Sequence, residues 1–116
     1  MKRYFIFICF IVLSLVAVSQ TYTGSVIRVI DGDTFVFQTQ DGSFIVRVYG
    51  TGAPERDQPY TRESADFLKR YLNKNAVLKA NGTDRYGRRT GVLFVKRKDI
   101  NLLSIRGGYS WHFRRY

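Results

Sequence analysis

A chain of 116 residues has room for one domain of ordinary size at most. Its single cysteine, Cys9, excludes a disulfide within the chain. Lysine and arginine outnumber aspartate and glutamate by 19 to 9, and this excess predicts a polyanionic partner, namely nucleic acid, an anionic membrane or an acidic polysaccharide, with a charge that serves only solubility as the alternative.

The first predicted element is a targeting segment. A basic start is followed by an almost unbroken apolar run over residues 4–18, and this pattern is typical of a secretory signal peptide comprising residues 1–19. A membrane anchor is the alternative, but the run is shorter than the roughly 20 residues that span a bilayer. We therefore expect a secreted or periplasmic, monomeric domain over residues 20–116 that has no stable membrane association after processing.

The next predicted elements are strands, indicated by apolar runs and by alternation along the chain. They are expected at residues 26–30, 35–39, 43–49, 76–80 and 91–95. Asp31-Gly32-Asp33-Thr34 is typical of a turn, and Asp41-Gly42 predicts a two-residue hairpin. In the third strand, period-two alternation directs Arg47 away from the face that carries Phe44.

Two helices complete the expected fold. A helix is predicted over residues 61–73, with Thr61 as its N-cap and an apolar face for the core. A basic turn at residues 96–98 precedes a shorter helix, which Asp99 caps and Gly107-Gly108 ends. Five short strands with hairpin turns and two helices predict the α+β class, with a five-stranded, partly open Greek-key barrel of the OB type.

Polar residues on or beside the predicted loops suit one kind of chemistry. Asp31, Asp33 and Glu55 supply carboxylates, and Arg47 and the segment at residues 84–88 supply guanidinium groups. Carboxylates bind a hard cation or orient a water molecule, and arginine forks bind the negative charge that develops at phosphorus. Singly each group is a weak signal, but together they match the requirements of phosphodiester cleavage.

Several segments of the sequence are similar to those of a known family, and they follow the family's order and spacing. The matching segments are Val29-Ile30-Asp31-Gly32-Asp33-Thr34, Val46-Arg47-Val48, Ala53-Pro54-Glu55, Asp84-Arg85-Tyr86-Gly87-Arg88 and Arg106-Gly107-Gly108-Tyr109-Ser110-Trp111. With them the chain resembles the thermonuclease family, the staphylococcal-nuclease-like domain, over almost the whole predicted mature chain.

This resemblance implies a secreted, calcium-dependent endonuclease that cleaves DNA and RNA and leaves 3′-phosphate ends. It implies that Arg47 and Arg88 hold the scissile phosphate, and that Glu55 is the general base toward the attacking water. The remaining implied roles are metal binding for Asp33, the backbone carbonyl of Ala53 and the nearby Asp31, and substrate binding for Arg85, Tyr86 and Tyr116.

The chain departs from the family pattern in two places. Where the family usually has Asp-Ala-Pro-Glu or Asp-Thr-Pro-Glu, this chain has Gly52, and the loss of a carboxylate is expected to weaken calcium binding. Family members usually continue into another helix, so the expected fold lacks the C-terminal family helix after Tyr116. The alternative function is a catalytically impaired module that binds nucleic acid without cleaving it.

Overall fold

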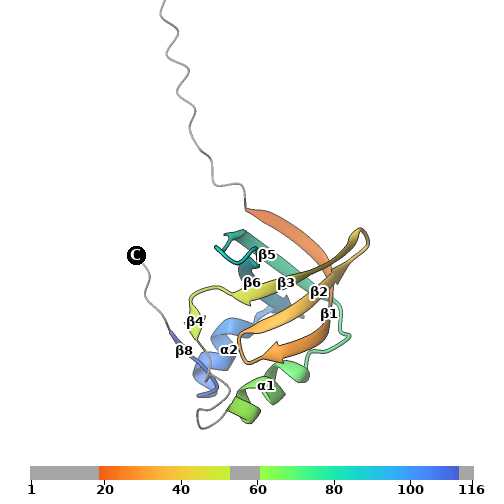
Figure 1. Ribbon diagram of the computed structural model, residues 1–116. Helices are drawn as coiled ribbons and strands as arrows, with labels where there is room; N and C mark the ends of the chain where they lie inside the picture. The colour runs from red at the N-terminus through yellow and green to blue at the C-terminus, as the bar shows by residue number, and fades with distance from the viewer. Residues whose placement is uncertain (1–18, 53–60, 113–116) are drawn as a thin grey trace, which may run out of the picture.

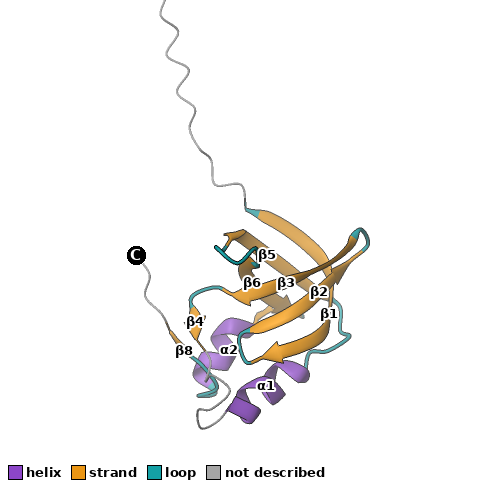
Figure 2. Ribbon diagram, viewed as in Figure 1, coloured by secondary structure: helices purple, strands orange, loops and turns teal. Residues whose placement is uncertain are grey.

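The computed structural model describes residues 19–52 and 61–112, and Figure 1 shows their arrangement. In chain order the elements are β1 (Gln20–Asp31), β2 (Thr34–Thr39), β3 (Gly42–Val48), β4 (Thr51–Gly52), α1 (Thr61–Lys69), β5 (Ala76–Thr83), β6 (Arg89–Val95), β7 (Lys98–Asp99), α2 (Ile100–Arg106) and β8 (Trp111–His112). Figure 2 shows both helices at the same end of the sheet. The predicted α+β class with an OB-type barrel and two helices is confirmed.

The barrel closes through a parallel pair of strands. Antiparallel pairing gives the order β3-β2-β1-β5-β6, and β3 then pairs in parallel with β6, with Arg47 opposite Thr90 and Val48 opposite Gly91. This pairing joins the two ends of the strand order into a barrel. It also brings together two segments that are far apart in the sequence.

Strand β1 begins at Gln20, earlier than the predicted range of 26–30. The prediction missed its first half because polar residues there give no apolar alternation. Residues Gln20–Gly24 pair with β5, and residues Ser25–Asp31 pair with β2. The strand changes partner at Gly24, where a Cβ atom would lie 1.9 Å from the carbonyl oxygen of Gln38. Only glycine allows the backbones of β1 and β2 to approach so closely.

The core lies inside the barrel and under the helices, and alternation along the strands explains its composition. The largest fully buried apolar side chains are Phe35, Phe37, Leu78, Leu93, Ile100, Val26 and Val46. Burial of each such side chain stabilises the fold by about 1.5–3 kcal/mol relative to exposure. On β3 the alternate residues Ile45 and Arg47 point outward, as predicted, so Arg47 is available to a surface site.

Helix α1 ends at Lys69, and the prediction that it runs to about residue 73 is wrong. The amides of Tyr71 and Leu72 bond to carbonyl oxygens three residues earlier, which tightens the last turn. Asn73 then adopts a positive φ of 59°. Its amide donates to the carbonyl oxygen of Val26 at 2.8 Å, so a tertiary hydrogen bond to β1 ends the helix.

Helix α2 has the caps that the sequence predicts. The Asp99 side chain accepts a hydrogen bond from the Leu102 amide, and the Gly107 amide donates to the carbonyl oxygen of Leu103. Beyond the helix, Tyr109 stacks on Phe67 of α1 with ring centroids 4.8 Å apart. This contact fixes the segment after α2 against α1.

The turn between β6 and β7 has an unusual sequence for its backbone conformation. Val95 pairs with Lys98, and the two residues between them, Lys96 and Arg97, have φ values of 50° and 64°. Two consecutive positive φ values define a type I′ hairpin, which strongly favours Asn-Gly. Lys96, Arg97 and Lys98 are all exposed, and we call them the basic tip.

Within residues 19–52 and 61–112, no helix combines the length and the apolar character that crossing a membrane requires.

Candidate active site

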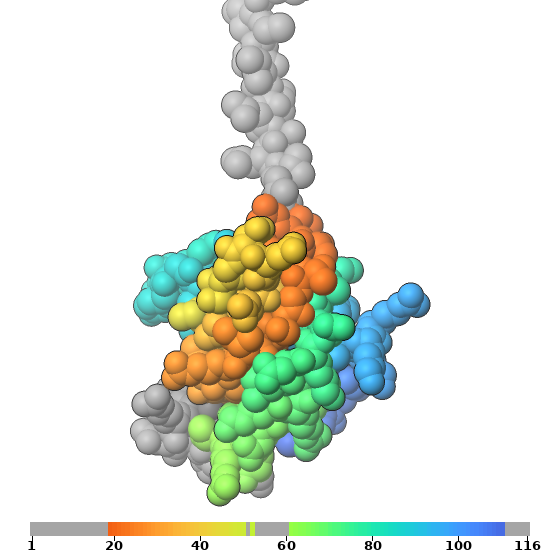
Figure 3. Space-filling view, turned by 90° about the vertical axis from the view of Figure 1, so that its right-hand side faces the viewer, coloured from red at the N-terminus to blue at the C-terminus, as the bar shows by residue number. Residues whose placement is uncertain are grey.

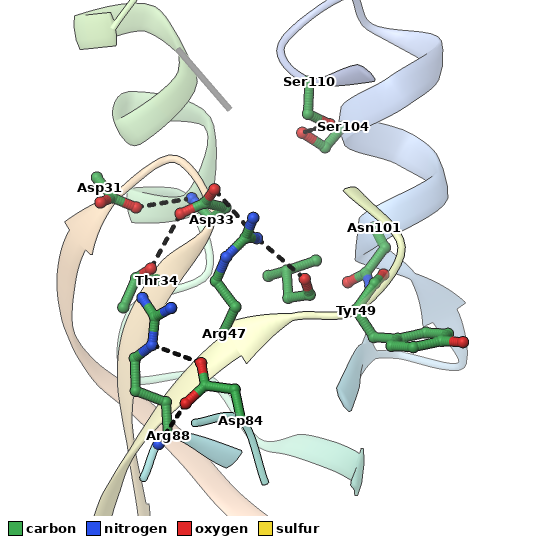
Figure 4. Close-up of polar contacts among 11 residues, drawn as sticks. Asp31, Asp33, Thr34, Arg47, Tyr49, Asp84, Arg88, Asn101, Ser104 and Ser110 are labelled. Carbon is green, nitrogen blue, oxygen red and sulfur yellow. Dashed lines mark hydrogen bonds and ion pairs between the residues drawn. The ribbon is translucent and has the colours of Figure 1, made fainter. Parts of the chain in front are cut away.

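The acidic turn between β1 and β2 holds the Arg47 side chain, as Figure 4 shows. Asp31 Oδ1 accepts a hydrogen bond from the Asp33 amide at 3.0 Å, and Asp33 Oδ1 accepts one from the Thr34 hydroxyl at 2.9 Å. Arg47 Nη1 lies 3.0 Å from Asp33 Oδ2 and donates to the carbonyl oxygen of Val48 at 3.1 Å. Arg47 is opposite Thr34 in the β2–β3 ladder, which places its side chain beside the turn.

The two carboxyl groups of this turn differ in their proton affinity. Burial, followed by the neighbouring carboxylate of Asp31, raises the pKa of Asp33 to about 6, although Arg47 opposes the shift. Burial also acts to raise the pKa of Asp31, but hydrogen bonds from Asp33 and Thr34, together with Arg47, outweigh it. The pKa of Asp31 therefore lies below its ordinary value, and its charge persists in moderately acidic solution.

The two residues that follow Arg47 form hydrogen bonds with three separate parts of the fold. The Val48 amide donates to the carbonyl oxygen of Asp33, and the Tyr49 amide donates to that of Gly91, each at 2.8 Å. Asn101, which is buried on α2, donates from Nδ2 to the carbonyl oxygen of Tyr49 at 3.1 Å. The end of β3 is therefore fixed in position before the chain reaches Gly50.

Arg88 is held by a carboxylate of its own loop, between β5 and β6. Asp84 Oδ1 accepts hydrogen bonds from the amides of Tyr86 and Arg88, and Oδ2 lies 2.8 Å from Arg88 Nε. Burial acts to raise the pKa of Asp84, but these hydrogen bonds and the Arg88 charge keep that pKa below its ordinary value. The Asp84 carboxylate therefore keeps its charge to a lower pH than an ordinary aspartate does.

Two arginines flank an exposed tyrosine in the same loop. The guanidinium carbons of Arg85 and Arg88 lie 5.0 Å and 5.4 Å from the centroid of the Tyr86 ring. The Tyr86 side chain is 69% exposed, so much of the ring faces solvent. An exposed ring beside guanidinium groups can stack on a planar ligand while the cations contact an anion.

The parallel pairing of β3 with β6 places Arg47 of β3 near the loop that carries Arg88. Arg47 is opposite Thr90 of β6, and Arg88 is the loop residue that directly precedes β6. Figure 4 shows the two arginine side chains together with the acidic turn. Two guanidinium groups close to an acidic turn form a surface that can bind an anion and a cation together. The predicted roles of Glu55, Ala53 and Tyr116 fall outside the described residues.

The acidic turn contains the type of ligand atom that a hard cation prefers. Asp31 and Asp33 offer carboxylate oxygens, which are the ligands that Ca²⁺ prefers. Within the described ranges no group of three or more histidine, cysteine, aspartate or glutamate side chains is placed to hold a metal. Gly52 is buried in β4 and pairs through its backbone with Trp111 of β8. Because the residue is glycine, this position supplies no carboxylate.

The structure identifies two positioning residues to which sequence reasoning assigned no role, Asp84 and Asn101. Asp84 belongs to the motif at residues 84–88, but an aspartate in a polar loop is usually a simple turn former. The signal in the sequence was an aspartate four residues before an arginine, with a glycine between them. In the structure this glycine, Gly87, has a φ of 80° and allows the turn. Asn101 gave none, because its partner is the distant Tyr49 backbone.

Comparisons with known proteins show which sequences this chain is similar to. The model of the family described as staphylococcal nuclease homologue matches residues 45–116. A protein named as an uncharacterized endonuclease from Haemophilus influenzae is 32% identical over 96 residues, which cover 81% of this chain and 54% of that protein. A thermonuclease from Staphylococcus hyicus is 35% identical over 91 residues, which cover 71% of this chain and 53% of that protein. The chain thus spans little more than half the length of these two relatives.

Proposed function

This chain belongs to the staphylococcal nuclease family, and we propose that it is an endonuclease that hydrolyses phosphodiester bonds in DNA and RNA and leaves 3′-phosphate ends. The observation that carries the proposal is the β3–β6 pairing, which brings Arg47 on β3 close to the start of β6, directly after the loop residue Arg88. Each arginine is oriented by a carboxylate, namely Asp33 for Arg47 and Asp84 for Arg88.

In the proposed mechanism the two arginines bind the scissile phosphate. Attack by water at phosphorus increases the negative charge on the non-bridging oxygens, and guanidinium groups bind that charge more tightly than they bind the starting diester. Glu55 is proposed as the general base that takes a proton from the attacking water. The bond between phosphorus and the 5′ oxygen breaks, so the phosphate stays on the 3′ side and the 5′ oxygen leaves as a hydroxyl, with its proton taken from solvent. Arg85 and Tyr86 are proposed to contact the adjoining nucleotide, with Tyr116 as a further contact.

Calcium is the proposed cofactor. Asp33, Asp31 and the carbonyl oxygen of Ala53 would hold it, and the bound cation would offset negative charge on the phosphate. Because Gly52 supplies no carboxylate, we propose that calcium is bound more weakly than in relatives with aspartate at this position.

Cleavage assays with controlled metal content test the proposed function. Full-length processed protein should degrade single-stranded DNA and RNA in millimolar calcium, should stop in excess chelator, and should leave ends that a 3′-phosphatase converts to 3′-hydroxyls. Glu55→Gln is the matched control, because it keeps the size of the side chain and removes the base. Cleavage by this variant at the rate of the unchanged protein would attribute the activity to a contaminant and reject the proposal.

Export is the second part of the proposal. It is supported by the basic start and the apolar run of residues 1–19. Protein recovered from the periplasm or the medium should begin at Gln20 when its N-terminus is sequenced, and should sediment as a monomer. Recovery of the uncleaved chain from the membrane fraction would support an anchor instead.

The second candidate function is nucleic-acid binding without cleavage, and Gly52 is the observation that favours it. The discriminating variant is Gly52→Asp, which introduces a carboxylate at the end of β4. If the metal site limits activity, this variant should bind calcium about tenfold more tightly by calorimetry and should cleave faster at low calcium. Equal calcium affinity in the two proteins would refute our account of Gly52.

Asp84 offers a test of how Arg88 is positioned. Replacement of Asp84 by asparagine keeps an oxygen for the loop amides but removes the charge that holds Arg88 Nε at 2.8 Å. We expect kcat to fall by about tenfold to a hundredfold through misplacement of the guanidinium group, with little change in Tm. Asp66→Asn is the control, because Asp66 pairs with Arg62 and Lys69 on the exposed face of α1. Equal kcat values for the two variants would show that Asp84 has no positioning role.

A further inference from the structure

The basic tip combines an unfavourable backbone with unpaired charge. Lys96 and Arg97 both occupy the left-handed region, at φ values of 50° and 64°, where side chains with a Cβ atom are disfavoured. All three residues of the tip are exposed, and none of them has an ion-pair partner among residues 19–52 and 61–112. The nearest acid in sequence, Asp99, uses its carboxylate to cap α2.

The tip lies away from the candidate active site. Arg88 directly precedes β6 and the tip follows it, so the two are separated by the length of a seven-residue strand, which is about 20 Å at 3.3 Å per residue. Figure 3 shows the light-blue segment of the β6–β7 hairpin on one side of the molecule, and the cyan loop between β5 and β6 on the other side. A dinucleotide bound at Arg88 spans less than about 10 Å and cannot reach the tip.

Strained backbone conformations occur at functional sites, where the residue type serves the function and is not the one that the conformation favours. Asn-Gly would satisfy this turn with less strain, whereas Lys-Arg presents two long cations at its apex. The tip has no exposed apolar residue that could enter a bilayer, because Val95 is buried and the three residues after it are charged. Its chemistry therefore matches the phosphate backbone of a polynucleotide better than a lipid surface.

We propose that Lys96, Arg97 and Lys98 form a second binding site for the phosphate backbone of long nucleic acids, separate from the site that cleaves them. This inference rests on the proposed function for the identity of the ligand. The tip binds a part of the strand that lies several nucleotides from the scissile bond. It raises affinity for long substrates through the release of counterions, and it has no effect on the chemical step.

The test combines Lys96→Asn with Arg97→Gly, which removes both apical charges and installs the preferred type I′ sequence. This variant should have a Tm higher by roughly 5 °C, so that lost binding cannot be attributed to unfolding. Binding to a labelled single-stranded DNA of about 20 nucleotides is measured by anisotropy at several salt concentrations, in the Glu55→Gln background. The slope of log K against log salt should be smaller in magnitude by about 1 for each lost contact. In the protein that keeps Glu55, the same tip substitutions should raise KM for long DNA and leave kcat for a dinucleotide unchanged.

The matched control combines Arg62→Gln with Lys69→Gln, which removes the same charge from the exposed face of α1. An equal loss of salt dependence in both double variants would show that net charge alone is responsible, and would overturn the proposal. An unchanged slope for the tip variant, accompanied by weaker binding to anionic phospholipid vesicles, would also overturn it. Binding is measured in a variant that lacks the proposed general base. If the unchanged protein cleaved no substrate, the proposed function would be rejected, but the binding test would still decide whether the basic tip binds nucleic acid.

Discussion

Replacement of Arg47 by lysine is expected to lower kcat by about a hundredfold to a thousandfold, with little change in KM for long DNA. Arg47 Nη1 lies 3.0 Å from Asp33 Oδ2 and donates to the Val48 carbonyl oxygen. A planar guanidinium group presents five N–H donors in a rigid fork, which matches the paired oxygens of a phosphate. A lysine ammonium is a single point charge and cannot reproduce this two-oxygen geometry.

Arg28→Lys is the control for this prediction, because Arg28 is an exposed arginine on β1 of the same sheet. Both variants keep the net charge, so long-range attraction of the substrate is preserved. Single-turnover cleavage separates the chemical step from binding. A kcat for Arg47→Lys within about threefold of the unchanged protein would remove Arg47 from the phosphate site.

The second large effect is on stability. Gly91→Ala is expected to lower the free energy of unfolding by about 3 kcal/mol, and to lower Tm by more than about 10 °C. A Cβ atom at this position would lie 2.6 Å from the carbonyl oxygen of Lys79 and 3.0 Å from the Cα atom of Ala80. These are backbone atoms of the partner strand β5, so no side-chain rotation relieves the overlap.

Gly82→Ala on β5 is the matched control for Gly91→Ala. Its Cβ atom would have only the Thr90 hydroxyl nearby, at 3.7 Å, which is ordinary contact. We expect this variant to unfold within about 1 kcal/mol of the unchanged protein in urea. If the two alanine variants had equal stability, the steric account of Gly91 would be wrong. Gly91 also accepts the hydrogen bond from the Tyr49 amide, so Gly91→Ala should disturb the end of β3 as well.

The sequence predicted those parts of the fold that depend on local pattern. Strands β2 and β3 show alternation along the chain, which the inward Phe35, Phe37 and Val46 confirm. The first half of β1 was missed because Thr21-Tyr22-Thr23 has no apolar alternation and takes its place through β5. The end of α1 was predicted too late, because a hydrogen bond from Asn73 to Val26 determines it. Contacts between residues far apart in sequence leave no periodic signal.

The same division holds for the candidate site. Arg47, Arg88 and the acidic turn could be named from their motifs, since residue types and spacing carry that information. The residues that orient them could not be named in this way. Asp84 acts through the shape of a short loop, and Asn101 acts on a backbone carbonyl from another element. The role of Glu55 stays a prediction.

Closure of the barrel by a parallel pair also has a consequence for how the protein folds. The β3–β6 contact joins segments separated by α1 and β5, and such non-local contacts form late because the chain between them must first be ordered. Hairpins such as β2–β3 and β5–β6 can form earlier. The approach of Arg47 to the loop that carries Arg88 would then be among the last features to appear during refolding, so recovery of activity should lag behind recovery of secondary structure after dilution from urea.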